Sequence, residues 1–494
     1  MTSARGSVAT LVVVAASALS AIVFAVAPVA CSSSDAATGA SPDATPGVFS
    51  YRGVGCQYDV SPPERHAFTD LALHDEKSAG SAPVRVRIGL GGDTKSDAPG
   101  YADPSRSVVV TWETPQPVRA AQLRFATTAG GPLVPVPGYS WTTPPPEVGF
   151  GSNEPATSMH EVHLCGLEAG RTYYYQVGGG SPEVWSTLQS FTTVPSGGKI
   201  TVGVLGDARD RVDVWQSVQR RMRDLAVNLQ VTTGDLVFTG TQQSLYDKWL
   251  DAIWKDPGDP ARFVTLGQQM MVMVAGNHEN DAARFFGAFA VPGTGAFAES
   301  FASFDVGNAH FVVFDDQAPA LIPDGDQAKA TIAFLESDLS RADANRAKVP
   351  FVVVVHHRGL YTTSNHADDS DVLDLRAILA PLYDAKHVDL VVNGHDHAFE
   401  RSKPLRPATD PRGAPSVVAA GQGVVYVVNA GAGADAYGVS DAPFIEKSAK
   451  YGKGTALDGV YGVITLEGRA LTLTSYGLSA AGNDPVLDTL TLTK

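Results

Sequence analysis

The chain has 494 residues, of which 44% are hydrophobic and 18% are charged, and this is enough for two or three domains with full cores. Its formal net charge of -15 argues against a protein that binds nucleic acid, because such a protein needs a basic surface. An anionic substrate remains compatible with this charge, since bound cations can invert the local field.

The N-terminus predicts export. The segment from Val8 to Ala30 is almost wholly apolar or small, and Arg5 is the only charge before it, so residues 1–30 are a signal peptide or a single membrane span. The residues around Cys31 resemble a bacterial lipoprotein processing site, with Pro28 as a departure from that pattern. We expect a lipid on Cys31 that anchors the protein to the membrane. An ordinary cleaved signal or a retained anchor are the alternatives, and all three export the mature domain to the cell surface, the periplasm or the medium.

Residues 31–80 are expected to form a tether and an N-terminal segment, and residues 81–195 to form an all-β domain. Short alternating runs broken by Gly and Pro predict the strands of this domain at residues 84–88, 107–112, 121–126, 160–164, 172–177 and 188–192. The stretch from Leu167 to Tyr175 resembles the corner before a late strand of fibronectin type III domains. That resemblance implies a Tyr, best matched by Tyr174, that hydrogen-bonds back to the turn, and a core Trp at Trp112.

Three cysteines are present in the chain. If Cys31 carries a lipid, Cys56 and Cys165 remain as a pair in an oxidising compartment, and a disulfide between them is the simplest use. Two buried free thiols are the alternative.

From residue 199 onward, strands alternate with helices. Apolar residues at helical spacing predict helices at residues 212–226, 242–254, 327–341 and 373–385, so a sheet with helices on both faces follows. Late strands at residues 424–429, 460–466 and 471–476 are expected to complete a second sheet.

Five strand-like runs in this half end in residues that can bind a metal. Ligands at the carboxyl ends of such strands converge on one crevice. The five strand ends carry Gly206-Asp207, Gly234-Asp235, Gly276-Asn277-His278-Glu279, His356-His357 and Gly394-His395-Asp396-His397.

This order of motifs resembles the calcineurin-like metallophosphoesterases, and more narrowly the purple acid phosphatase branch. The resemblance implies an α/β (α+β) four-layer metallophosphoesterase sandwich over residues 199–494, preceded by the fibronectin III-like sandwich. It also implies an exported, metal-dependent phosphoric ester hydrolase whose substrate is a small phosphoester.

The resemblance further implies a pair of metal ions bridged by Asp235. Asp207 and His397 would complete the first site, and Asn277 and His395 the second, with one histidine from the pair His356 and His357. Spacing to Tyr361 and His366 favours His357, whereas a one-residue insertion would select His356. Carboxylate, amide and imidazole ligands together suit Fe, Mn or Zn.

Two residues depart from the pattern of the relatives. Phe238 stands where the purple branch has a Tyr ligand, so no purple colour is expected. Arg209 stands where other calcineurin-like enzymes place a His. We interpret Arg209 as a ligand of a phosphate oxygen, with a surface salt bridge as the alternative.

The expected reaction is attack of a metal-bound hydroxide on a phosphomonoester, with a phosphodiester as the closest competing substrate. His278 is predicted to act as the general acid, Glu279 to orient it, and His366 to reach the substrate. A structural hydrogen bond is the alternative role for His278, and a solvated loop position for His366. A degenerate surface-binding protein and a structural single-metal site are the rival functions.

Overall fold

A computed structural model describes residues 49–92, 101–144, 154, 156–256, 259–291 and 296–494. The predicted signal peptide, the lipid site at Cys31 and the start of the tether lie outside these residues. Across the described part of the chain, every helix is too short or too polar to cross a membrane.

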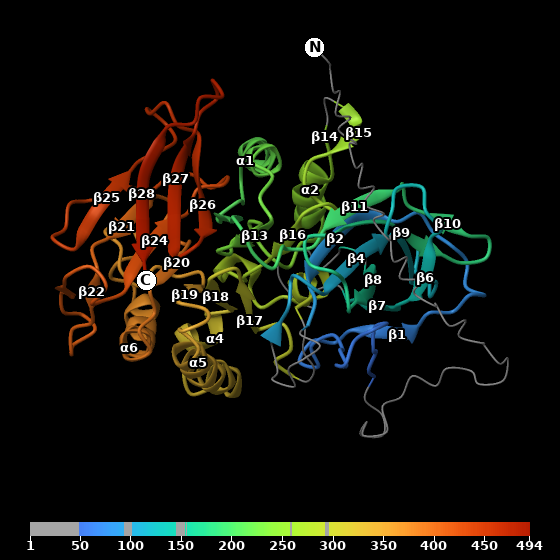
Figure 1. Cartoon of the computed structure of the whole chain (residues 1–494), viewed down its shortest axis with the longest axis horizontal. Coiled ribbons are helices and arrows are strands. Elements are labelled where there is room, and N and C mark those ends of the chain that lie inside the picture. Colours follow the sequence, from blue (N-terminus) through green and yellow to red (C-terminus); the bar gives the residue numbers. More distant parts are fainter. Residues whose placement is uncertain (1–48, 93–100, 145–153, 155, 257–258, 292–295) are drawn as a thin grey trace, which may run out of the picture. The chain divides into compact units, whose positions relative to one another are not determined.

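An eleven-stranded sheet joins the two halves of the chain (Figure 1). Strand β2 of the N-terminal half runs parallel to β16 of the C-terminal half, with Ile88 opposite Met270. In spatial order the sheet contains β1 (Thr69–Leu73), β7 (Tyr139–Thr143), β8 (Thr157–Leu164), β4 (Val108–Thr114), β2 (Val84–Leu90), β16 (Met270–Val272), β13 (Leu229–Thr232), β12 (Ile200–Leu205), β26 (Gly459–Glu467), β27 (Ala470–Leu478) and β28 (Val486–Thr493).

A smaller sheet completes the N-terminal all-β region. Its strands are β10 (Val184–Trp185), β9 (Thr172–Gly179), β5 (Gln122–Ala126), β6 (Val134–Pro137) and β11 (Gln189–Thr192). Trp112 is buried between the sheets, as expected. The corner contact is made by Tyr173 and not by Tyr174: the Tyr173 hydroxyl accepts a hydrogen bond from the Glu168 backbone N–H at 2.8 Å, because Tyr173 is the residue whose side chain faces the core. The Cys56–Cys165 disulfide is present, which confirms that prediction.

A third sheet contains the remaining ligand-bearing strands. Its spatial order is β25 (Ile445–Ala449), β21 (Phe399–Ser402), β24 (Val425–Asn429), β20 (Leu390–Asn393), β19 (Phe351–Val355), β18 (Ala309–Phe314), β17 (Phe301–Val306) and β3 (Tyr101–Ala102). Two short hairpins, β14 (Lys255–Asp256) with β15 (Asp259–Phe263) and β22 (Leu405–Arg406) with β23 (Ser416–Val417), lie outside the large sheets.

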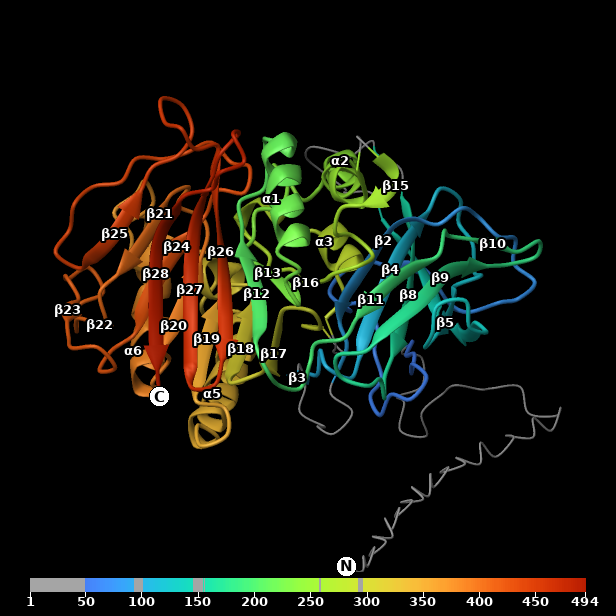
Figure 2. The ribbon, with the colours of Figure 1, turned by 45° about the horizontal axis from the view of Figure 1, so that its top comes forward.

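Alternating burial along the strands produces four layers (Figure 2). On β19, Val353 and Val355 face the core between the two large sheets, whereas Val352 and Val354 face the core beneath the outer helices. A strand that is apolar on both faces has to be buried on both faces, and the continuous run of valines in β19 predicts this arrangement.

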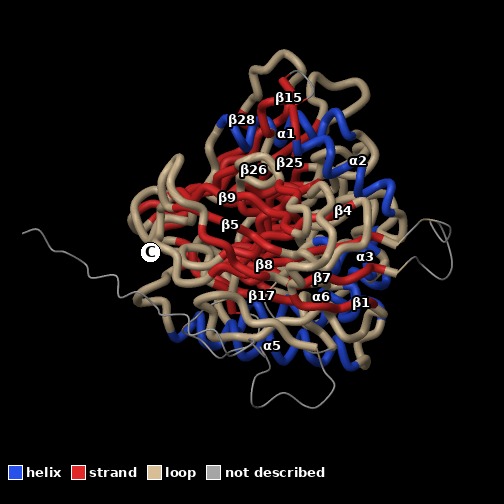
Figure 3. Tube along the Cα trace, turned by 90° about the vertical axis from the view of Figure 1, so that its right-hand side faces the viewer, coloured by secondary structure: helices blue, strands red, loops and turns tan. Residues whose placement is uncertain are grey.

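The helices supply the outer layers (Figure 3). Helices α1 (Val212–Asp224) and α2 (Gln243–Trp254) pack through Trp215 and Trp249, whose rings stack 4.6 Å apart. Helices α5 (Asp326–Ala344) and α6 (Ser370–Ala385) cover the third sheet. The short elements are the 3-10 helix Asn277–Glu279, α3 (Ala283–Ala288) and α4 (Gln317–Leu321).

The predicted four-layer fold is therefore confirmed, but the placement of the late strands is partly wrong. Strand β24 joins the third sheet as expected, whereas β26 and β27 extend the first sheet by antiparallel pairing with β12. Their amphipathic pattern suits an outer part of either sheet, so the sequence does not specify the partner.

Candidate metal centre

The carboxyl ends of five strands meet at one place, as the sequence predicts. Strands β12, β13 and β16 of the first sheet and β19 and β20 of the third lead into the loops that carry the candidate ligands. Glycines allow the loops to close on the carboxylates: a Cβ at Gly394 would lie 2.5 Å from Asp207 Oδ2, and one at Gly276 would lie 2.3 Å from Asp235 Oδ1.

Four atoms that can bind a metal ion converge at the second predicted site. Asn277 Oδ1 lies 2.9 Å from His357 Nε2 and 3.0 Å from His395 Nδ1. The two imidazole nitrogens are 3.2 Å apart, and His357 Nε2 is 3.3 Å from Asp235 Oδ1. Such separations fit ligands around one ion with bonds of about 2.1 Å.

The hydrogen bonds of His357 show that its ring directs a lone pair toward the second predicted site. His357 Nδ1 donates to the Thr233 carbonyl at 2.7 Å, so its Nε2 carries a lone pair that faces the oxygens of Asn277 and Asp235. Acceptors that face one another in a buried site repel each other unless a cation lies between them. Asp235, Asn277, His357 and His395 therefore fit a divalent cation.

The first predicted site is also buried, and it contains a guanidinium. His397 Nδ1 donates to the Asp435 carbonyl at 2.7 Å, which leaves Nε2 as an acceptor 3.6 Å from Asp207 Oδ1. Arg209 Nη2 donates to that same Nε2 at 3.4 Å, and Arg209 Nε lies 3.8 Å from Asp235 Oδ2. Only 10% of the Arg209 side chain is exposed, so the alternative of a surface salt bridge is wrong.

Burial sets the protonation of these groups. It lowers the pKa of His395 well below its usual value, lowers that of His357, and lowers that of His397 to about 3, so all three imidazoles stay neutral. Burial, followed by the charge of Asp235, raises the pKa of Asp207 well above its usual value. A nearby cation would offset both effects on this carboxylate.

His357, not His356, joins the cluster. His356 faces the other way, with Nδ1 3.0 Å from Asp316 Oδ2 and its ring stacked 4.9 Å from Phe314. Successive side chains of a strand point to opposite faces, so only one of the two neighbours can reach the crevice. Asp316 also accepts from Arg358 and packs the base of this loop.

His278 lies at the rim of the cluster, with 24% of its side chain exposed. Its Nδ1 donates to the Phe238 carbonyl at 2.5 Å, and its Nε2 lies 3.8 Å from Asp235 Oδ2. The Phe238 ring is 5.6 Å from the His278 ring and is 55% exposed, so Phe238 points to solvent and not to the carboxylates.

The predicted role of Glu279 is wrong. Its buried carboxylate does not contact the His278 ring but accepts backbone N–H groups from Gly276 at 2.6 Å, Asp235 at 2.9 Å and Leu236 at 2.9 Å. It therefore fixes the turn that presents Asp235. Burial, followed by the charge of Asp235, raises the pKa of Glu279 to about 8.

His366 lies beside the cluster. Its ring is 4.1 Å from the His395 ring, and its Nδ1 donates to Asp369 at 2.7 Å. Its backbone N–H donates to Asp396 Oδ1 at 2.9 Å. His366 is thus held against the second site and is not a free loop residue.

Sequence reasoning missed Tyr437. Its ring stacks on the His397 ring at 4.0 Å and lies 5.6 Å from the His366 ring, so it covers the first site. Tyr437 lies in a loop of Gly and Ala after β24 and has no motif around it, so the sequence carries no signal for it.

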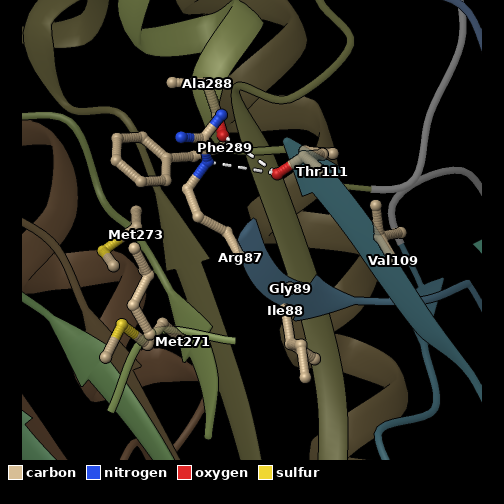
Figure 4. A pocket seen from close by; sticks show the side chains of 11 residues that line it. Arg87, Ile88, Gly89, Val109, Thr111, Met271, Met273, Ala288 and Phe289 are labelled. Carbon is tan, nitrogen blue, oxygen red and sulfur yellow. Dashed lines mark hydrogen bonds between the residues drawn. The ribbon is translucent and has the colours of Figure 1, made fainter. Parts of the chain in front are cut away.

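A separate pocket lies at the junction of β2 and β16 (Figure 4). Arg87 lines it and donates to Thr111 at 3.2 Å and to the buried Glu113 at 2.7 Å. The pocket shares none of its lining residues with the metal-binding cluster, and its charged lining residue Arg87 pairs with Glu113, so we assign it a packing role.

Comparison with known proteins supports the same interpretation. Residues 100–193 match the model "Purple acid Phosphatase, N-terminal domain", and residues 200–399 match "Calcineurin-like phosphoesterase". Purple acid phosphatase 22 of Arabidopsis thaliana is 27% identical over 50% of this chain and 54% of its own length. Acid phosphatase type 7 of Homo sapiens is 26% identical over 69% of this chain and 78% of its own length.

The fold has a counterpart among solved structures. Purple acid phosphatase PPD1 from yellow lupin (Lupinus luteus) seeds aligns with a TM-score of 0.65 at 19% identity, over 84% of this chain and 74% of that one. At this identity the likeness supports the fold alone.

Proposed function

Because the chain belongs to the calcineurin-like phosphoesterases and carries the N-terminal domain of purple acid phosphatases, we propose that it is a metal-dependent hydrolase of phosphomonoesters. The observation that carries this proposal is the convergence of Asp235, Asn277, His357 and His395 on one point. Carboxylate, amide and imidazole ligands suit Zn, Mn or Fe. Such an ion, when bound, acidifies water for attack on phosphorus and offsets the charge of the phosphoryl group.

The side chains around this point supply proton transfer. We assign His278 as the general acid for the leaving oxygen, because its exposed ring is held by the Phe238 carbonyl at Nδ1 and keeps Nε2 available. His366, held by Asp369, would contact the substrate from the opposite loop.

A monoester fits this site better than a diester. A phosphomonoester carries up to two negative charges on its non-bridging oxygens, and the site offers a cation position and the Arg209 guanidinium. The sequence further predicts a second cation between Asp207, Asp235 and His397.

We also propose that the protein works outside the cytosol, since disulfides such as Cys56–Cys165 persist in oxidising compartments. The lipid anchor at Cys31 stays a prediction from the sequence.

The direct test compares hydrolysis of p-nitrophenyl phosphate and bis(p-nitrophenyl) phosphate by the purified chain. We expect a higher kcat/KM for the monoester, and its loss in His357→Ala, which removes a ligand. His387→Ala is the control, because His387 is an exposed histidine whose ring bonds Asp343 on the surface. A folded wild-type protein that hydrolyses neither ester would favour a binding role instead.

A further inference from the structure

Arg209 lies where the first cation would have to bind. Its backbone N–H donates to the Asp235 carbonyl at 3.2 Å, which fixes the start of the side chain beside the bridging carboxylate. Its guanidinium then reaches His397 Nε2 at 3.4 Å and lies 3.8 Å from Asp235 Oδ2. Its positive charge also acts on Asp207, the third ligand expected at this side.

The guanidinium competes for the lone pair that a cation would need. Because His397 Nδ1 is bonded to the Asp435 carbonyl, Nε2 is the only nitrogen of this ring that can bind a metal. An ion about 2.1 Å from Nε2 would lie within about 5.5 Å of Arg209 Nη2, given the 3.4 Å between the two nitrogens. Two positive charges at that distance in a buried site repel each other strongly.

The charges of Phe238 and Arg209, the two residues that differ from the pattern of the relatives, also argue against a cation at the first site. Phe238 removes the negative phenolate that the resemblance expects, and Arg209 adds a positive charge where relatives place a neutral His. Compared with either group of relatives, the first site has gained at least one unit of positive charge, which weakens its attraction for a cation. Asp207 and Asp235 are both buried and need positive partners, which one bound cation and one guanidinium supply.

Arg209 also retains a free donor. Its Nε is buried and has no hydrogen-bond partner among the described residues, and the oxygens of Asp210 and Asp235 lie 3.9 and 3.8 Å away. A buried N–H of this kind needs an acceptor, and a phosphoryl oxygen is the acceptor that the proposed function brings.

We propose that the Arg209 guanidinium takes the place of the cation between Asp207, Asp235 and His397, so that the chain binds one cation and holds the phosphoryl group with Arg209. This inference rests on the proposed function, and it replaces the predicted pair of cations by one cation and one arginine. The cation belongs to Asp235, Asn277, His357 and His395.

The test counts metal ions on the full mature chain. After saturation with Mn²⁺ and removal of free ion, elemental mass spectrometry should give one Mn per wild-type chain, and electron paramagnetic resonance should show an uncoupled six-line spectrum. The variant Arg209→His, which restores the residue of other calcineurin-like enzymes at this position, should gain a second, coupled ion. Two coupled ions in the wild type would overturn the proposal, whatever the variants do.

Phosphate binding gives a second readout. Arg209→Gln should raise the Kd of inorganic phosphate about 10- to 100-fold, since it removes a charged hydrogen bond, and should keep one Mn per chain. Arg211→Gln is the matched control, because Arg211 is two residues away but pairs with Asp213 on the surface. Unchanged phosphate affinity in Arg209→Gln would contradict the role of Arg209. Two ions with active hydrolysis refute only this inference, whereas a chain that hydrolyses no phosphoester with any metal refutes the proposed function.

Discussion

Glu279→Gln tests how the turn before the metal centre is held. The wild-type carboxylate accepts three backbone N–H groups, from Gly276, Asp235 and Leu236. Glutamine offers one oxygen, which can keep the Gly276 and Asp235 bonds, and an NH₂ group that faces the Leu236 donor. One buried donor left without an acceptor costs about 1–3 kcal/mol. We therefore expect the free energy of unfolding to fall by about that amount.

The same variant should weaken the metal centre, because the displaced turn carries Asp235. Loss of a residue that orients a ligand typically costs about 10- to 100-fold in metal affinity or activity. The free energy of unfolding of the variant and the wild type is compared by urea unfolding at pH 9. This pH lies above the Glu279 pKa of about 8, so the wild-type carboxyl group is ionised. Titration with Mn²⁺ measures the affinity.

Asp338→Asn is the matched control for Glu279→Gln. Asp338 is also a buried carboxylate, and it accepts from Ser303 Oγ at 2.8 Å and pairs with His310 at 2.8 Å, away from the cluster. This variant should lose stability without losing metal affinity. If Glu279→Gln binds Mn²⁺ as tightly as the wild type, the account of the turn is refuted.

Three further predictions concern single groups. His278→Ala should lower kcat on alkyl phosphomonoesters about 10²- to 10⁴-fold and less on p-nitrophenyl phosphate, whose leaving group needs little proton donation; equal losses on both would contradict a general acid. Burial lowers the pKa of His310, but hydrogen bonds and charges from Asp305 and Asp338 outweigh burial and raise this pKa to about 9. The stability that this pair of bonds contributes, on the order of 2–4 kcal/mol, is therefore complete below pH 6.5 and is lost as the pH rises through 9. Urea unfolding at pH 6 and pH 9.5 should show this loss in the wild type but not in His310→Gln. An equal change in the free energy of unfolding between the two pH values in both proteins would refute the prediction. Cys56→Ser should lower the free energy of unfolding by about 2–5 kcal/mol, because the disulfide closes a loop with a sequence separation of 109; a dithiol reductant should destabilise the wild type and leave the variant unchanged.

Much of the centre could be predicted from the sequence, because each ligand directly follows an apolar run. Strands β12, β13, β19 and β20 end no more than two residues before their predicted ligand motifs, and their carboxyl ends have to meet at one crevice. The choice of His357 over His356 came from the spacing to Tyr361 and His366 that the resemblance implies, and the alternation of side chains along the chain after β19 explains it.

Other features could not be predicted because they depend on contacts between distant segments. Glu279 has its partners on the Asp235 turn, more than forty residues earlier in the chain, and a sequence motif does not show which donors a carboxylate will meet. Tyr437 reaches His397 from a loop that has no pattern. The sequence predicts that Arg209 reaches the substrate, but its contact with His397 depends on the close approach of two strand ends, which the sequence alone does not specify.

Metal-dependent release of phosphate tests the central claim most directly. The purified chain is freed of metal with a chelator and assayed on a phosphomonoester before and after addition of Zn²⁺, Mn²⁺ or Fe²⁺, beside Asn277→Ala, which lacks the amide oxygen shared by His357 and His395. We predict no turnover without metal, recovery with at least one of these ions, and no recovery in the folded Asn277→Ala variant. Equal phosphate release by the wild type with and without metal, or by both proteins, would contradict a metal centre built from these strand ends.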